Sequence, residues 1–262
     1  MNQLPEGSGP VSVCRVGIRE LPSARTEAGD YLIRIMESGC GAVFCGGEPS
    51  LMIPGTAMLL RPGAVPDYCM LEDPVFLDFH FNEDAANLMR SNAPAFAAGD
   101  LRTVPSEILP RIAHLADEIE RESQRRKPGY QLALLEKILS LDRMLFRHGR
   151  PPREAEKKIA RSLMFMEENH SRDITLHDLA ELTGLSVSYY RRVFQKLLGR
   201  SPIDFLVGLR LRHAEQLLAG KKLSIAEVAR ETGFSDPNYF SRMFSRTRGM
   251  PPREWRRSPA KN

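Results

Sequence analysis

The sequence predicts an α+β protein with a β-rich N-terminal domain (residues 1–104), a helical segment (105–150) and an all-α C-terminal domain (151–262). Three observations support this prediction. Short apolar runs fill the first domain, apolar residues take helical spacing from about residue 105, and a twelve-residue pattern occurs twice in the last domain. The 262 residues are enough to form two separate cores.

The N-terminal domain has the pattern of an all-β fold. Its apolar runs are as short as strands and are bounded by turn-forming residues. They cover residues 31–36, 42–45, 50–53, 57–60 and 75–81. Pro54 and Gly55, like Pro62 and Gly63, suit tight turns because proline presets φ and glycine accepts positive φ. Strands of this length and spacing predict a β-barrel or a sandwich.

Two helices are predicted in the segment that follows. Each carries one apolar stripe at spacings of four, three and four residues, and Pro128 and Gly129 separate them. The stripes consist of Ile108, Ile112, Leu115 and Ile119, then Leu134, Ile138, Leu141 and Leu145. Such stripes could pack on the barrel, on each other or on a partner chain. Residues 148–153 contain two adjacent prolines and are predicted to form a linker.

The C-terminal domain contains the same pattern twice, at residues 175–186 and 224–235. The offset is 49 residues and becomes 50 after the inserted Asp236. Each copy predicts a helix, a glycine-containing turn and a second helix with arginines on its outer face. That is the pattern of a helix-turn-helix that contacts DNA. A further helix, beginning at Pro202 and ending near Gly220, is predicted to join the two copies.

Residue spacing separates a core face from a DNA face in each copy. The second helices are predicted to begin at Ser186 and Ser235 as N-caps. Their inward residues are Leu185, Val193, Phe194, Phe234, Met243 and Phe244. Their outward, DNA-facing residues are Ser188, Arg191, Arg192, Gln195 and Lys196, and then Asp236, Asn238, Ser241 and Arg242.

Several of these outward side chains have the chemistry of DNA contacts. Arginine can bond guanine, and asparagine adenine, through two hydrogen bonds each. We expect Arg192 and Arg242, which occupy equivalent positions, to contact bases or phosphates, and Lys196 to neutralise phosphate. Asp236 could instead cap its helix or accept a bond from cytosine. Two such helices about 34 Å apart would enter successive major grooves.

Charge is unevenly distributed along the chain. Residues 1–150 hold 16 lysines and arginines against 20 acidic residues, whereas residues 151–262 hold 21 against 13. The basic half suits a polyanion such as DNA. The sequence has no apolar run of the ~18 residues that cross a membrane and no signal-peptide pattern at its start. A cytoplasmic protein without a membrane partner and with reduced cysteines is therefore predicted.

Residues 155–257 resemble the DNA-binding domain of AraC/XylS-type bacterial transcription regulators. The resemblance lies in the connecting helix, in the second copy of the repeat and in the segment after it. Its motif residues are Arg210, Leu211, Ala214, Leu217 and Leu218, then residues 224–229, 233–235 and 239–244, and Gly249, Pro251 and Pro252. The resemblance implies that Ser188, Arg191, Arg192, Pro237, Asn238, Ser241 and Arg242 contact bases. Pro237 would do so only by apolar contact, such as with a thymine methyl group.

The first half resembles the cupin-like effector domain of the same family at residues 29–32, 39–41, 54–55, 61–63 and 80–81. This implies a β-barrel that binds a small-molecule effector, a sugar in some members, followed by helices that form a homodimer. The candidate effector-binding residues are Tyr31, Arg34, Tyr68 and His80. For the first three, a place in the core is an equally good interpretation.

The sequence thus predicts a transcription regulator and not an enzyme. Its expected partners are double-stranded DNA, a small-molecule effector, a second copy of the chain and, if it is an activator, RNA polymerase. One alternative is a cupin-type metal or thiol redox enzyme or sensor tethered to DNA, and another is an architectural DNA-binding protein that needs no ligand.

The metal and thiol alternatives have little support in the residue spacing. His80 is the only histidine among residues 1–104, so neither a metal site nor a cofactor is expected. Cys14, Cys40, Cys45 and Cys69 match no Cys-x-x-Cys pattern. They are expected to be small buried thiols, with a thiol sensor or a soft-metal site as the alternative.

Overall fold

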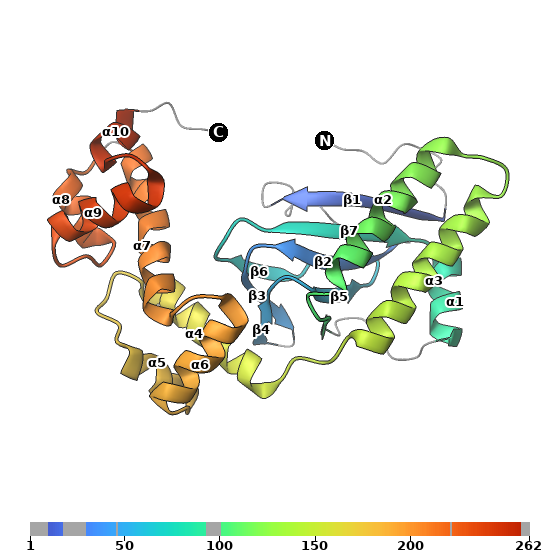
Figure 1. The fold of residues 1–262 in the computed structure, drawn as a ribbon, viewed down its shortest axis with the longest axis horizontal. Coiled ribbons are helices and arrows are strands. Elements are labelled where there is room, and N and C mark those ends of the chain that lie inside the picture. Colours follow the sequence, from blue (N-terminus) through green and yellow to red (C-terminus); the bar gives the residue numbers. More distant parts are fainter. Residues whose placement is uncertain (1–9, 18–29, 46, 93–100, 221, 258–262) are drawn as a thin grey trace. The chain divides into compact units, whose positions relative to one another are not determined.

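The computed structural model divides the chain into two compact units, residues 1–160 and 161–262. It describes residues 10–17, 30–45, 47–92, 101–220 and 222–257 (Figure 1). The division falls within helix α4 (Glu154–Asn169), ten residues beyond the boundary expected from the sequence. Each unit has its own hydrophobic core.

The first unit contains two antiparallel sheets. The larger has the order β1 (Val11–Gly17), β7 (Val75–Phe81), β2 (Tyr31–Ser38), β5 (Thr56–Leu60) and β8 (Leu101–Thr103). The smaller has the order β4 (Glu48–Met52), β3 (Gly41–Cys45) and β6 (Asp67–Met70). The β-rich domain predicted from the sequence is confirmed.

The predicted barrel is not closed, because the two sheets remain separate over the described residues. The edge strand β8 of the larger sheet has only three residues. The backbone of Thr103 there exchanges hydrogen bonds with Arg150, with N–O distances of 2.9 and 3.1 Å.

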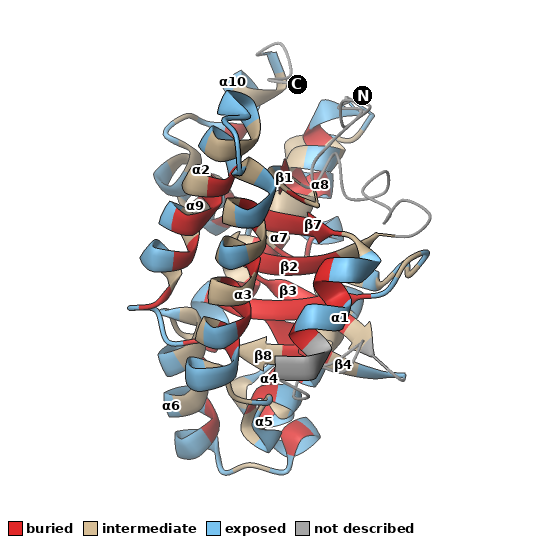
Figure 2. Ribbon diagram, turned by 90° about the vertical axis from the view of Figure 1, so that its right-hand side faces the viewer, coloured by how far each residue is buried: buried red, intermediate tan, exposed pale blue. Residues whose placement is uncertain are grey.

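Both faces of the larger sheet are buried, since side chains alternate along each strand. In β2, Leu32 and Met36 belong to the cluster between the two sheets, whereas Ile33 and Ile35 pack beneath helices. The covering helices are α1 (Glu83–Asn92), α2 (Leu109–Arg125) and α3 (Tyr130–His148) (Figure 1). Figure 2 shows the strands of this sheet as a largely buried layer.

The apolar stripes predicted on α2 and α3 are used within the chain. Ile112, Ile119, Leu134 and Ile138 are fully buried against the larger sheet and against one another. Burial of each such side chain stabilises the fold by roughly 1.5–3 kcal/mol. A dimer contact would therefore have to use other faces of these helices.

The linker is anchored at its beginning. α3 ends at His148 and α4 begins at Glu154, as the paired prolines predicted. The Arg150 guanidinium bonds both carboxylate oxygens of Glu156, at 2.9 and 2.5 Å. Burial alone would raise the pKa of Glu156, but the bonds from Arg150 and from the Arg153 N–H lower it. This ion pair connects the edge of the larger sheet to the first turn of α4.

The second unit is helical throughout its described elements. It contains α5 (Leu176–Thr183), α6 (Val187–Leu198), α7 (Pro202–Ala219), α8 (Ile225–Glu231), α9 (Pro237–Arg248) and α10 (Pro252–Arg257). Both predicted helix-turn-helix units and the joining helix are confirmed, whereas α10 was not predicted. No described helix combines the length and the hydropathy of a membrane-spanning segment.

The two copies of the repeat begin in the same way and differ at the second helix. Thr175 with Asp178, and Ser224 with Glu227, form reciprocal capping boxes at α5 and α8. Ser186 caps α6 as predicted. The prediction that Ser235 caps α9 is wrong, because the inserted residue Asp236 accepts from the Asn238 N–H at 2.8 Å and lets the helix begin at proline.

Asp142 gives a test of the packing of α3. Burial raises the pKa of this carboxyl from 3.8 to about 6. Because the folded-state pKa lies above the unfolded one, stability contributed by this group is present at low pH and lost as pH rises through about 6. Asp142→Asn should therefore raise the free energy of unfolding at pH 7.5 by about 1–2 kcal/mol, and by almost nothing at about pH 3, below the unfolded pKa. Calorimetry at both pH values measures this, with the exposed Glu136→Gln on the same helix as control. An equal gain at both pH values would contradict the assignment.

Candidate nucleic-acid interface

Each recognition helix is oriented by two buried aromatic residues one turn apart. In α6 these are Tyr190 and Phe194, and in α9 they are Phe240 and Phe244, all fully buried. The Tyr190 hydroxyl donates to Ser162 Oγ at 3.0 Å, and its burial raises the pKa of Tyr190 further above its usual value. With this side of each helix fixed in the core, the opposite side faces solvent.

The outer face of α6 carries the predicted DNA-contacting residues as one continuous surface. All five are exposed or half-buried, and together they line a shallow depression of about 430 Å³. They are Ser188, Arg191, Arg192, Gln195 and Lys196. The Arg192 guanidinium lies 5.2 Å from the centre of the exposed Tyr189 ring, which favours one orientation of the arginine over the helix surface.

The outer face of α9 is similar in shape but differs in chemistry. Asp236, Pro237, Asn238 and Arg242 are exposed, and Ser241 is half-buried. Asp236 uses one carboxylate oxygen as the helix cap. The Ser241 hydroxyl donates to the Pro237 carbonyl at 2.9 Å. The Asn238 amide and the Arg242 guanidinium therefore provide the principal outward donors of this predicted set.

The two helix-turn-helix units are held together by Arg210 of α7, whose structural role the sequence analysis did not identify. Its Nε and Nη2 donate to the carbonyls of His170 and Arg172 after α4, at 2.7 and 2.6 Å. Its guanidinium lies 5.9 Å from the ring of Phe234 in the second turn. Arg210 thus connects the first helix-turn-helix to the turn of the second.

Gly233 is part of the same contact between the two helix-turn-helix units, which we call the Arg210–Gly233 joint. It has φ of 84°, and a Cβ placed there would lie 2.6 Å from the His170 carbonyl oxygen and 2.9 Å from Arg210 Nε. Beside it the His170 and His213 rings stack with centroids 3.8 Å apart, and His213 Nε2 lies 3.1 Å from Glu167. This close approach leaves no room for a side chain at position 233. The spacing between the two helix-turn-helix units therefore depends on glycine there.

The candidate effector residues do not form one pocket. Arg34 is 1% exposed and donates to both Asp78 oxygens at 2.8 and 2.5 Å and to the Tyr68 hydroxyl at 3.2 Å. Burial alone would lower the pKa of Arg34, but Asp78 raises it above its usual value. Arg34 and Tyr68 thus join the two sheets. Tyr31 instead stacks on Phe81 at 5.8 Å and packs with the cluster under the helices.

His80 lines a cavity of about 420 Å³ at the ends of β1, β2 and β7, which the sequence analysis did not find. Helices α1 and α3 supply part of its wall. Its lining residues are Pro10, Ser12, Asp30, His80, Phe81, Asn82, Asp84, Gln131 and Leu135. Most of these side chains can donate or accept hydrogen bonds, so the cavity suits a polar ligand.

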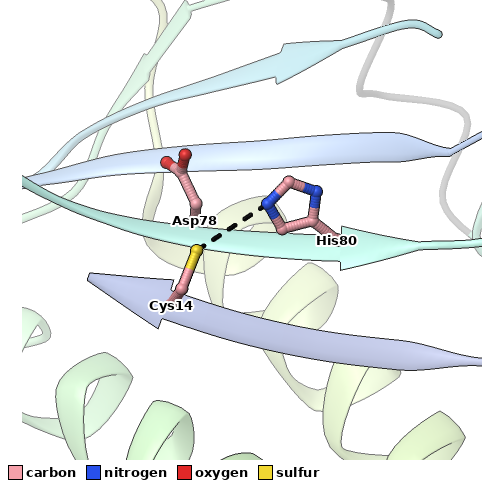
Figure 3. A group of neighbouring side chains, drawn as sticks. All are labelled: Cys14, Asp78 and His80. Carbon is pink, nitrogen blue, oxygen red and sulfur yellow. Dashed lines mark hydrogen bonds between the residues drawn. The ribbon is translucent and has the colours of Figure 1, made fainter. Parts of the chain in front are cut away.

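Cys14 and Asp78 lie beside His80 in the space between the sheets (Figure 3). Cys14 pairs with Asp78 across β1 and β7, and His80 follows two residues later on the same face. One potential ligand atom from each lies within 4.8 Å of the others. The expectation of no metal site depended on spacing along the sequence, and strand pairing brings together residues 66 positions apart. The arrangement has the donor types of a soft-metal site.

Comparisons with known proteins support the helix-turn-helix interpretation of the C-terminal domain. Residues 179–258 match the family "Helix-turn-helix domain". The HTH-type transcriptional activator RhaR of Enterobacter sp. (strain 638) is 26% identical over 231 residues, 83% of this chain and 81% of the relative. The lactose operon transcription activator of Staphylococcus xylosus is 33% identical over 34% of this chain and 32% of its own length. A crystal structure of an AraC-type DNA-binding domain-containing regulator from Chromobacterium violaceum is 31% identical, covers 40% of this chain and 93% of its own, and has a TM-score of 0.38.

The joint around Gly233 predicts a difference between two glycine substitutions. Gly249 has a similar φ of 75°, but no neighbouring atom lies within 4 Å of the position that a Cβ would take there. Gly249→Ala should therefore destabilise the second unit only by the roughly 1–2 kcal/mol of a left-handed residue. Gly233→Ala should add about 1–3 kcal/mol from overpacking. Urea unfolding followed by fluorescence of Trp255, the sole tryptophan, which packs on Phe244, measures both. Equal losses would show that the close approach is not a constraint.

Proposed function

We propose that this chain, which carries the helix-turn-helix domain of AraC-type transcription regulators, binds one DNA site with α6 and α9 under control of a small molecule bound in its first unit. The resemblance predicted from the motifs is confirmed, and the chain is a DNA-binding regulator and not an enzyme. The observation that carries the proposal is the pair of equivalent recognition helices with exposed arginines, joined through Arg210 and Gly233.

The geometry of the second unit supports binding to two successive grooves. The 18-residue α7 spans about 27 Å at 1.5 Å per residue, comparable with the ~34 Å between major grooves on one side of the duplex. The joint limits rotation of one helix-turn-helix against the other. Both recognition helices would therefore enter DNA as a pair.

The exposed side chains divide into two roles. We assign base contacts to Arg191, Arg192, Asn238 and Arg242, supported by Ser188 and Gln195 on the same surface. Lys196 would bind phosphate. Pro237 would contact a thymine methyl, while Asp236 and Ser241, whose side chains bond the backbone of α9, would shape the start of that helix.

The effector would occupy the cavity lined by His80. Ser12, Asp30, Asn82, Asp84 and Gln131 offer donors and acceptors suited to a neutral polyhydroxyl compound such as a sugar. Relatives named as the lactose operon transcription activator and the melibiose operon regulatory protein support this class. The hydrogen bond between Arg34 and Tyr68 would hold the two sheets together near the cavity. Tyr31 would fix the ring of Phe81, which lines the cavity, by stacking on it.

A homodimer and an activating role complete the proposal. Leu132 and Phe146 of α3 are 74% and 52% exposed and offer an apolar outer face to a second copy. Relatives named as transcriptional activators favour contact with RNA polymerase. A protein that binds the chromosome in this way would act in the bacterial cytoplasm.

Footprinting on DNA that flanks the gene would test the core of the proposal. We expect protection of two adjacent major-groove segments per protomer, with affinity well above that for bulk DNA. Uniform weak binding that disappears with salt would mean that only phosphate attraction operates, and the proposal of a specific regulator would fail.

Arg242→Ala should weaken specific binding more than non-specific binding, by about 1–3 kcal/mol of discrimination, because a base contact is lost. Arg246→Ala, an exposed arginine one turn later on α9, is the matched control. It should weaken both kinds of binding alike and lower the salt slope by about one. Titrations on operator and on bulk DNA at two salt concentrations separate these effects. Equal losses from Arg242→Ala on both DNAs would refute its base-contacting role.

Gln131→Ala should weaken effector binding by about 2- to 13-fold, since a neutral hydrogen bond contributes about 0.5–1.5 kcal/mol. The measurement is calorimetric titration with the sugar that gives the largest thermal shift in a screen. Gln124→Ala on α2, which bonds only exposed Glu120 among the contacts described for it, is the control. Unchanged affinity in Gln131→Ala would place the ligand outside this cavity.

A further inference from the structure

We infer that Cys14 and His80 form a binding site for a soft monovalent cation of the Cu(I) class, beside the neutral Arg34–Asp78 ion pair. Within the described residues, these three side chains are the one group with clustered metal-ligand atoms. Cys14 Sγ lies 3.9 Å from His80 Nε2 (Figure 3). This inference goes beyond the proposed function, because it concerns a metal site and does not depend on DNA binding.

The register of the larger sheet creates the site. Asp78 lies in β7 between Cys14 on β1 and Arg34 on β2, opposite both in the register. His80 is the next residue of β7 on the same face. Cys14 and His80 are therefore diagonal neighbours across paired antiparallel strands, whose separation of about 7–8 Å, somewhat less at Cβ, is within reach of long side chains. The ligands therefore have a rigid backbone frame and need little rearrangement to meet a cation.

The distance suits two ligands on one metal ion. With metal–sulfur and metal–nitrogen bonds of about 2.3 and 2.0 Å, as for zinc, the two atoms would lie about 3.5 Å apart at a tetrahedral angle and about 4.3 Å apart in line. The observed 3.9 Å falls between these limits. Thiolate and imidazole are also the ligands that soft first-row cations prefer.

The surrounding charges select a monovalent ion. Asp78 is fully buried, and both of its oxygens already accept hydrogen bonds from Arg34, so the two side chains neutralise one another. When the Cys14 thiol loses its proton to water and binds a monovalent cation, the net charge between the sheets is unchanged. A divalent cation would leave one uncompensated positive charge near Arg34, which is costly in a buried place.

The site is within reach of an ion from solvent. Cys14 is half-buried, and His80 lines the cavity of about 420 Å³ at the strand ends. Ser12, paired with His80 across the strands, lines the same cavity. An ion can therefore approach from the cavity, while the Arg34–Asp78 pair closes the inner side.

Chelator competition on the reduced, full-length protein tests the inference. Cu(I) is supplied without oxygen as its coloured complex with bicinchoninate, and loss of colour measures transfer to the protein. We expect one equivalent to transfer. Cys14→Ser and His80→Gln should each weaken binding by at least ~100-fold, at or beyond the upper end of the 10–100-fold cost of losing an outer-shell partner. Cys69→Ser removes a thiol of similar exposure on the other sheet and should change nothing.

The outcomes separate the claims. No transfer to the wild-type protein, or equal transfer to Cys14→Ser, would overturn the site. Retention of Zn(II) as tight as that of Cu(I) in parallel competition would overturn the monovalent assignment. Circular dichroism and thermal unfolding establish that each variant is folded, and His80→Gln provides a second test if Cys14→Ser is not. Because metal transfer is measured without DNA, its failure is distinguishable from failure of the regulator proposal.

Discussion

Two aromatic residues one turn apart fix each recognition helix in its core, and the DNA-facing surface depends on this constraint. Tyr190 with Phe194, and Phe240 with Phe244, are fully buried, so the arginines between and after them must face solvent. The core contacts are apolar and aromatic, which leaves the outward positions free to differ in chemistry. The first copy presents two adjacent arginines and the second an asparagine and an arginine. One scaffold can thus contact two unlike half-sites, provided that the spacing between the copies is held. Arg210 and Gly233 hold that spacing by hydrogen bonds and by a close approach that excludes a side chain.

The first unit is organised around a different buried interaction. Arg34 and Asp78 place opposite charges between the two sheets, and Arg34 also bonds Tyr68 from the smaller sheet. Removing either partner would leave a buried charge, which typically costs about 3–5 kcal/mol. The same pair restricts the charge of a ligand that Cys14 and His80 can bind. The pair is neutral, so an added charge beside it would have no opposite charge nearby. An uncharged sugar in the adjacent cavity and a monovalent metal in place of a thiol proton both satisfy that condition.

Helices could be predicted from sequence where the spacing of apolar residues along the chain matches the face that each helix buries. Helical spacing identified α2 and α3, and the repeat identified the four helices around the two turns. The α9 cap was assigned to Ser235, with Asp236 as the alternative that the structure supports, because both residues are good caps and only the following proline favours Asp236. Barrel closure was predicted and is wrong, because closure depends on pairing between sheet edges, which apolar runs along the sequence do not specify. The cluster of Cys14 and His80 joins residues 66 positions apart. In β7, Asp78 and His80 alternate with the apolar residues Leu77, Phe79 and Phe81. This alternation was the local signal that two polar side chains share one face of the strand.

Regulation requires that a ligand have different affinities for two states of the protein, and that both units respond to the difference. The chain offers one element whose residues belong to both units. Glu156, in the first turn of α4, bonds Arg150 beside the edge strand β8, and Ser162, later in the same helix, accepts a hydrogen bond from the Tyr190 hydroxyl of the first recognition helix. β8 pairs with β5, whose other neighbour is β2, the central strand that contains Arg34. A ligand that alters the packing between the sheets would therefore act on the edge strand that the Arg150–Glu156 pair joins to the first turn of α4.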